Sequence, residues 1–172
     1  MLLVGGASRR FGSPKALARL GGETLAERAW RALGEACDER IAVGKVSDGL
    51  ELPFPLLDDG TDVRAPIAGV VAGLRAARHE VCVFLPVDSP LITASSLRRL
   101  GEVVGVAATG PLPGAYARSA LPQLERRLAA GELALWRVVA ELGLPKVEIE
   151  PDELLNVNSK ADLELVASRL VD

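Results

Sequence analysis

A basic, glycine-rich segment opens the chain and has the residue types that bind phosphate. Residues 3–15 read LVGGASRRFGSPK, so Gly5 and Gly6 are closely followed by Arg9, Arg10 and Lys15. Glycines let backbone N–H groups approach an anion, and the cationic side chains supply charge. The obvious ligand is the phosphate chain of a nucleotide. The alternative from these residues alone is a turn at the glycines and a solvated basic loop.

The spacing of this segment excludes two common phosphate-binding motifs. A P-loop needs G-x-x-x-x-G-K-[ST], whereas Gly6 and Gly12 are separated by five residues and Gly12 is followed by Ser13 and Pro14. The dinucleotide fingerprint G-x-G-x-x-G is also absent. If this segment binds a nucleotide, it does so with another kind of loop.

A carboxylate, Asp88, follows the strongest strand signal in the chain. Residues 81–85 are apolar without alternation, which is typical of a central parallel strand covered on both faces. Open α/β sheets bind ligands at the carboxyl ends of their strands, so Asp88 and the glycine segment are expected to face one crevice. The alternative is that Asp88 caps the next helix.

The histidine and the cysteines give no comparable signal. His79 is the only histidine and has no neighbour in the sequence that could orient it for a Ser-His-Asp or Cys-His mechanism. Cys37 and Cys82 are far apart and fit core positions better than a disulfide or a metal site. Trp30 likewise fits a helix face packed on the core rather than a platform for a nucleic-acid base.

Strands and helices alternate along the chain, which predicts one three-layer α/β/α domain with a mostly parallel, Rossmann-like sheet. Thr24 and Glu27 form a capping-box pattern at the start of a helix over 25–36, and Gly69 and Gly73 would let a later helix sit close to the sheet. Further helices are expected from Pro66, after Thr93, over 119–129 and 133–142, and after Ser159. Strands are expected at 2–5, 40–46, 54–57, 80–88, 103–109, 115–117 and 146–149.

Composition limits the function. The chain has 172 residues, of which 49% are hydrophobic, and a net charge of −3, so one domain is expected and no general attraction to nucleic acid or anionic membrane. No apolar run reaches the roughly 20 residues of a membrane span, and no signal-peptide pattern is present. A cytoplasmic protein is expected.

The motifs, taken together, resemble a known family over nearly the whole chain. Residues 3–15 resemble the L-A-G-G-x-x-x-R-M-G-x-x-K signature of the nucleotidyltransferases that make molybdenum cofactors. The other matching blocks are Asp58-Asp59 after a strand, residues 65–70 (APIAGV), 86–91 (PVDSPL), 112–118 (LPGAYAR) and 156–163 (NVNSKADL). The resemblance implies the nucleotidyltransferase type of Rossmann-like fold.

Three details resemble the guanylyltransferase subgroup, which joins GMP from GTP to molybdopterin. Cytidylyltransferases of the pathway usually have L-A-A-G where this chain has Gly5-Gly6. They lack the P-L-A-G block, which is present here as residues 66–69 (PIAG). They also favour D-x-D-T-P where this chain has residues 156–158 (NVN). The alternatives are transfer of CMP to molybdopterin or of another nucleotide to a phosphorylated acceptor. A non-catalytic nucleotide- or partner-binding protein on the same fold is a further alternative.

The resemblance implies roles for individual residues. Backbone groups of Leu3, Gly5 and Gly6 would contact the guanine nucleotide, and Lys15 would bind its phosphates together with Arg9 or Arg10. Asp58 or Asp59 would touch the nucleoside, with Asp59 favoured by its spacing to Pro66, and Asp88 would hold Mg²⁺. Asn156 and Asn158 would lie on the acceptor side, although asparagines that form a turn fit them nearly as well.

The same resemblance implies which ligands bind and which part of the chain binds each of them. GTP and molybdopterin are the expected small-molecule partners, with Mg²⁺ as cofactor and transient contact with proteins that deliver or receive the molybdenum cofactor. A monomer is expected. Residues 1–100 would mainly bind the nucleotide and residues 101–172 the acceptor.

The chain departs from the family pattern at three places. Pro14 stands where the family often has aspartate, and residues 43–46 (VGKV) stand where an asparagine usually recognises the nucleotide. Residues 132–135 (ELAL) replace a basic pair. If that pair helps to hold the acceptor in relatives, this chain must use other residues.

Overall fold

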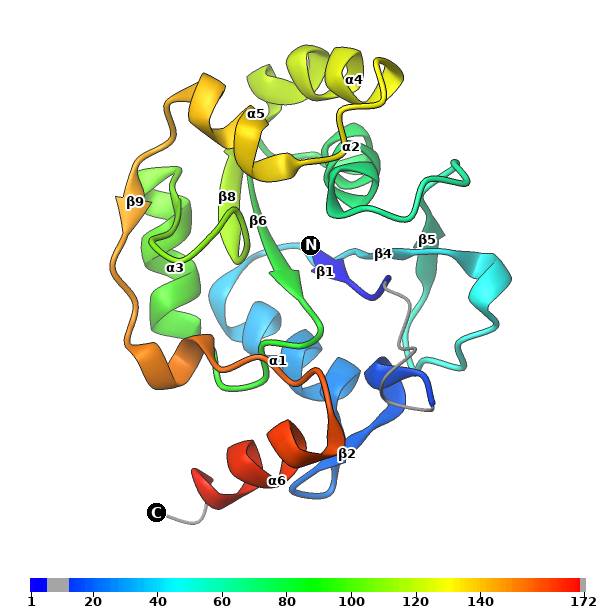
Figure 1. The fold of residues 1–172 in the computed structure, drawn as a ribbon, viewed down its shortest axis with the longest axis vertical. Helices are drawn as coiled ribbons and strands as arrows, with labels where there is room; N and C mark the ends of the chain where they lie inside the picture. The colour runs from blue at the N-terminus through cyan, green and yellow to red at the C-terminus, as the bar shows by residue number, and fades with distance from the viewer. Residues whose placement is uncertain (6–12, 171–172) are drawn as a thin grey trace.

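The computed structural model describes residues 1–5 and 13–170, and in this part of the chain a seven-stranded sheet runs through the molecule (Figure 1). Its strands are β1 (Leu2–Leu3), β4 (Ala42–Gly44), β5 (Leu56–Asp58), β6 (Val81–Pro86), β7 (Val106–Ala107), β8 (Gly114–Ala117) and β9 (Lys146–Val147). Their order is β5-β4-β1-β6-β8-β7-β9. Neighbours from β5 to β6 are parallel, β8 is antiparallel to both β6 and β7, and β9 is parallel to β7. The mostly parallel α/β sheet confirms the predicted fold class.

Helices cover both faces of this sheet. They are α1 (Leu25–Ala36), α2 (Pro66–Ala76), α3 (Ala94–Val103), α4 (Leu121–Ala129), α5 (Leu135–Leu142) and α6 (Lys160–Ser168). Figure 1 shows α1 and α3 on one side of the strands and α2, α4 and α5 on the other. The layers are therefore α/β/α, as predicted.

Strand β6 shows why the sheet is buried on both sides. Val83 and Leu85 belong to the core cluster that contains the apolar residues of α1 and α3, whereas Cys82 and Phe84 belong to the cluster under α2, α4 and α5. Successive side chains of a strand point to opposite faces, so an unbroken apolar run satisfies both layers. The predicted parallel pairing holds toward β1. It is wrong on the other side, because β8 runs antiparallel to β6.

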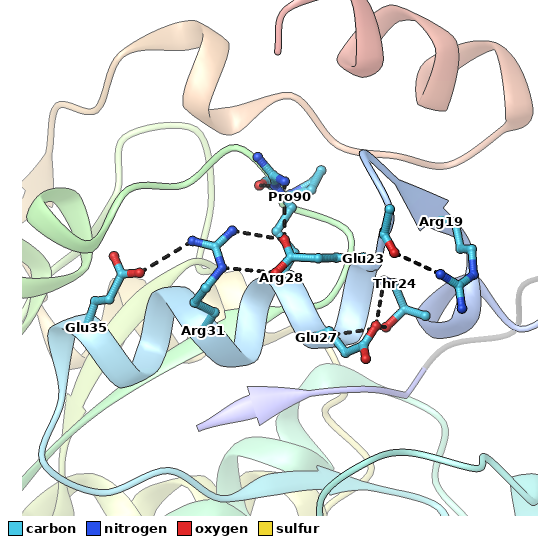
Figure 2. A network of polar contacts seen from close by, with 9 residues as sticks. Arg19, Glu23, Thr24, Glu27, Arg28, Arg31, Glu35 and Pro90 are labelled. Carbon is cyan, nitrogen blue, oxygen red and sulfur yellow. Dashed lines mark hydrogen bonds and ion pairs between the residues drawn. The ribbon is translucent and has the colours of Figure 1, made fainter. Parts of the chain in front are cut away.

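Helix α1 has a complete N-terminal capping box and forms a hydrogen bond to the loop that follows β6 (Figure 2). Its capping box is present, since the Glu27 N–H donates to the Thr24 hydroxyl over 3.1 Å and the Glu27 carboxylate accepts from the Thr24 N–H over 2.8 Å. Farther along, the guanidinium of Arg28 donates to the backbone carbonyl of Pro90 over 3.0 Å. Because Pro90 comes two residues after Asp88, this contact holds the segment next to that carboxylate.

Three other predicted helix starts are confirmed, whereas the helices predicted from residues 119 and 133 begin two residues later, at Leu121 and Leu135. Pro66 is the first residue of α2, the Thr93 hydroxyl accepts from Ser96 N–H at the start of α3, and Ser159 forms a capping box with Asp162. Gly131 has a φ of +76° and separates α4 from α5. The ends of regular structure were predicted well where side-chain caps fix them.

Several predictions of elements differ from the structure. Val103 belongs to helix α3, and the strand expected over 103–109 is shortened to β7. A two-stranded hairpin, β2 (Arg19–Leu20) with β3 (Glu23–Thr24), was not predicted. It precedes α1 directly. Trp30 does pack on the core, stacked on Phe54 with 4.2 Å between ring centroids.

Candidate functional site

A cavity of about 640 Å³ opens at the carboxyl ends of β1, β4, β5 and β6, within the described residues. That volume lies in the range of small-molecule sites in proteins, about 300–1,000 Å³. Of the predicted site residues, the cavity is lined by Leu3, Gly5, Lys15, Asp59, Asp88 and Asn156. The expected crevice between the glycine segment and Asp88 is therefore present.

Lys15 links two segments that are far apart in the chain. Its ammonium group lies 3.1 Å from Asp88 Oδ2 and donates to Asn158 Oδ1 over 2.9 Å. The side chains of Lys15 and Asp88 are 16% and 27% exposed, so water screens the pair only in part. Lysine, carboxylate and amide thus form one polar cluster beside the cavity.

The segment around Asn156 and Asn158 is fixed by its own hydrogen bonds. The Ser89 hydroxyl donates to Asn156 Oδ1 over 2.9 Å, and the backbone N–H of Val157 donates to the carbonyl of Asp88 over 2.8 Å. Asp162 accepts from the Asn158 N–H, and this bond is the main reason that the pKa of the Asp162 carboxyl is lowered. The C-terminal segment is thereby held against the loop that carries Asp88. Ser89 is 2% exposed and was not singled out in the sequence.

The two neighbouring aspartates have different surroundings. Asp58 is exposed and accepts from the backbone N–H groups of Val46 and Gly60, each over 2.8 Å, and these bonds lower the pKa of its carboxyl. Asp59 lines the cavity and has an 8% exposed side chain. Asp58 therefore shapes its own turn, and Asp59 is the member of the pair placed to meet a ligand.

Lys45 is the partner of Asp59 and was not among the predicted site residues. Its ammonium group donates to both carboxylate oxygens of Asp59, over 2.7 and 2.9 Å, and to the backbone carbonyl of Thr61. Gly44 and Asp58 are paired as the last residues of β4 and β5, so Lys45 and Asp59, which follow them, lie side by side at the carboxyl edge of the sheet. The sequence signal was a lysine directly after an apolar strand on the same edge as Asp59.

Some predicted residues cannot be placed. Gly6, Arg9 and Arg10 lie outside the described residues. Leu3 is buried at the end of β1, and the exposed Gly5 follows it. These two residues bring the backbone of the opening segment to the cavity.

The alternatives raised by the sequence can now be compared with contacts. Thr93, and not Asp88, is the N-cap of α3, so the capping interpretation of Asp88 is wrong. His79 and Cys82 lie at the start of β6, the end opposite Asp88. Both cysteines are free thiols, and burial raises the pKa of each.

The donor atoms at Asp88 suit a hard cation that keeps most of its water. Among the described residues, no group of three or more His, Cys, Asp or Glu side chains is arranged to hold a metal. Asp88 offers a carboxylate, and the amide side chain of Asn156 lines the same cavity. Mg²⁺ is commonly bound by one or two carboxylates plus substrate phosphates and water, so the residues present fit it.

Comparison with known proteins identifies the family. The model of the MobA-like NTP transferase domain matches residues 1–146. The chain belongs to this family. A probable molybdenum cofactor guanylyltransferase of Aquifex aeolicus is 31% identical, covering 96% of this chain and 88% of the relative. One of Chloroflexus aggregans is 33% identical, covering 99% and 93%.

Solved structures agree with the fold of the MobA-like NTP transferase family. A nucleotidyl transferase from Methanothermobacter superposes with a TM-score of 0.77 at 22% identity, covering 99% of this chain and 95% of that one. The family match and the relatives confirm the resemblance stated from the motifs, and the protein is a nucleotidyltransferase. The residues matched by the family model include Lys15, Asp59 and Asp88 but not Asn156 and Asn158. In the described part of the chain, no helix is long and apolar enough to cross a membrane.

Proposed function

We propose that this nucleotidyltransferase transfers GMP from GTP to the terminal phosphate of molybdopterin, with release of diphosphate. The observation that carries the proposal is the cluster of Lys15, Asp88 and Asn158 beside a nucleotide-sized cavity. The names of the relatives, molybdenum cofactor guanylyltransferases, supply the expected substrates. The cluster also agrees with a reaction between two phosphate groups.

The reaction needs alignment and charge compensation more than proton transfer. A phosphate oxygen of the acceptor forms a bond to the α-phosphorus of GTP, and the bond from that phosphorus to the β-phosphate oxygen breaks. The attacking oxygen is already anionic, so no general base or covalent nucleophile is required. The site must hold two anions in line and offset the charge between them.

Each residue of the cluster has a task in this scheme. Lys15 neutralises phosphate charge, supported by Arg9 or Arg10 of the opening segment, while Leu3, Gly5 and Gly6 contact the nucleotide through the backbone. Asp88 would hold Mg²⁺, which when bound offsets phosphate charge. Asn156 and Asn158 face the acceptor, because they belong to the segment held against the Asp88 loop by Val157 and Ser89.

In this scheme the ion pair between Lys15 and Asp88 would be exchanged for contacts with the substrates. The Oδ2 atom that accepts from Lys15 is one of the two oxygens that a cation can use. Phosphate oxygens then replace the carboxylate as acceptors for the ammonium group. Because both side chains are partly exposed, water can solvate the separated charges, and breaking the ion pair costs little free energy.

Turnover with different nucleotides tests the proposal. The protein is incubated with molybdopterin, Mg²⁺ and either GTP, CTP or UTP, and both diphosphate and the dinucleotide product are measured. GTP is expected to give the highest kcat/KM. A preference for CTP or UTP, or turnover only with another phosphorylated acceptor, would refute the substrate assignment.

A further inference from the structure

A buried ion pair lies in the nucleotide cavity away from the cluster that handles phosphate. Lys45 and Asp59 both line the cavity, and each side chain is 8% exposed. Removing two charges from water is costly, and a buried pair of this kind often adds little to stability. Its place in a ligand cavity therefore calls for a role in binding.

The hydrogen bonds of Lys45 and Asp59 show which of the two side chains can still bind a ligand. The three N–H donors of Lys45 match three acceptors, the two oxygens of Asp59 and the carbonyl of Thr61. Asp59 Oδ1 accepts from Lys45 and also from the N–H of Thr61, over 3.2 Å. Among the described residues, Oδ2 accepts from Lys45 alone. A carboxylate oxygen has two acceptor positions, so Oδ2 keeps one for a ligand.

The position of Asp59 fits the base of a nucleotide rather than its phosphates. In the sheet, β5 lies three strands from β6, a separation of about 14 Å at about 4.8 Å per strand. Phosphates held near Lys15 and Asp88 leave the base to reach toward β4 and β5. The segments after these strands also line the cavity with apolar side chains, Leu50 and Val63, which suit the faces of a flat ring.

We infer that Lys45 is a positioning residue for nucleobase recognition: its two hydrogen bonds hold the Asp59 carboxylate in one orientation, so that Oδ2 accepts an N–H of guanine. Guanine carries N–H groups at positions 1 and 2, where adenine has an acceptor nitrogen and a C–H. The positive charge of Lys45 also offsets Asp59, so the carboxylate does not repel the triphosphate of the same ligand. This inference rests on the proposed use of GTP.

Nucleotide binding by paired variants tests the role of Lys45. Binding of GTP and of ATP, each with Mg²⁺, is measured by calorimetry for the wild type, Lys45→Met and the double variant Lys45→Met/Asp59→Asn. Hydrogen bonds to charged groups contribute about 1.5–3 kcal/mol, so the dissociation constant for GTP is expected to rise about 10- to 100-fold in both variants. The constant for ATP should change little, and kcat at saturating GTP should fall far less than kcat/KM.

The double variant guards against a folding defect, because it removes both buried charges and leaves neither unpaired. Arg127→Met is the control, since Arg127 forms an exposed ion pair with Glu141 outside the cavity. Lys45→Met, or the double variant if the single one does not fold, must lose the preference for GTP over ATP. A retained preference would overturn the inference, whereas a wild type that neither binds nor uses GTP would refute the proposed function itself.

Discussion

At the scale of single residues, the candidate site depends on one lysine that contacts both the expected metal ligand and an expected acceptor-side residue. Lys15 is bound to Asp88, which follows β6, and to Asn158, which precedes α6. A lone lysine beside an aspartate would be an ordinary ion pair. The second contact, with Asn158, places the ammonium group between the expected nucleotide side and the expected acceptor side.

Removing either charge of this pair should abolish most turnover and leave the fold intact. In Lys15→Ala the phosphates lose a compensating charge, and in Asp88→Ala the expected Mg²⁺ ligand is lost. Loss of one such electrostatic group typically lowers kcat about 100- to 1,000-fold. Guanylyl transfer measures this effect, and thermal unfolding checks the fold, because a partly exposed pair contributes at most about 1 kcal/mol.

The matched control is Lys146→Ala, an exposed lysine of β9 at the far edge of the sheet. It should leave kcat and KM unchanged. Guanylyl transfer close to the wild-type rate by Lys15→Ala or Asp88→Ala would show that these residues are not catalytic.

Residue types predicted part of the site. Asp88 could be picked from the sequence because charged residues at the ends of apolar strands gather at one edge of an α/β sheet. Lys15 could be picked because it belongs to the basic, glycine-rich segment, and Asp59 through the resemblance to the family. Lys45 was not picked although it directly follows an apolar strand, because its importance depends on burial and on the register that brings it to Asp59. Ser89 was missed for the same reason, since only the folded chain brings its hydroxyl to Asn156.

At the scale of elements, helix α2 reaches the sheet because two of its residues lack a side chain. A Cβ at Gly69 would lie 2.8 Å from a methyl group of Leu3, and one at Gly73 would lie 2.6 Å from the ring of Phe84. The close packing predicted for these glycines is thus present. Leu3 also lines the cavity, so the approach of α2 helps to place the end of β1.

Gly73→Ala should destabilise the protein although alanine is the better helix former. Phe84 is fully buried and contacts Tyr116 edge to face, so its ring cannot move aside freely. Overpacking of this kind costs about 1–3 kcal/mol, and most of this range exceeds the gain of about 1 kcal/mol in helix propensity. Urea unfolding measures the difference.

Gly34→Ala in α1 is the control for helix propensity. The new Cβ there would meet the guanidinium of Arg40, the far end of a flexible side chain. Gly34→Ala should destabilise the protein less than Gly73→Ala, because moving Arg40 gives up only an exposed hydrogen bond to the Trp30 carbonyl and a contact with the Trp30 ring. If Gly73→Ala were equally stable, the glycine would not be required for packing.

Local signals decided which elements were predictable. Helix α1 was predicted with its observed ends because Thr24, Glu27 and the spacing of apolar residues all agree. The hairpin of β2 and β3 and the shortness of β7 were not predicted, because strands of two residues leave almost no periodic pattern. The antiparallel pairing of β8 is set by long-range contacts, about which the sequence of a single strand gives no information.

At the scale of the whole molecule, distant parts of the chain meet in one site. Val157 donates to the carbonyl of Asp88, and Lys15 bonds to Asn158, so the opening segment, the loop after β6 and the segment before α6 are linked. The expected division into a nucleotide half and an acceptor half stays a prediction. In this arrangement, a nucleotide in the cavity would contact segments that only the folded chain holds together.

Such a ligand should raise the apparent stability of the whole fold, because it binds the native state and not the unfolded chain. At a concentration of about 100 times Kd the gain is about 2.7 kcal/mol, which for a protein of this size raises Tm by about 5–10 °C. Thermal unfolding is followed with GTP, CTP or ATP, each with Mg²⁺ and with a chelator. GTP with Mg²⁺ should protect most, and chelation should reduce the shift. Equal protection by all three nucleotides would contradict recognition of guanine, and a shift unaffected by chelation would contradict a metal at Asp88.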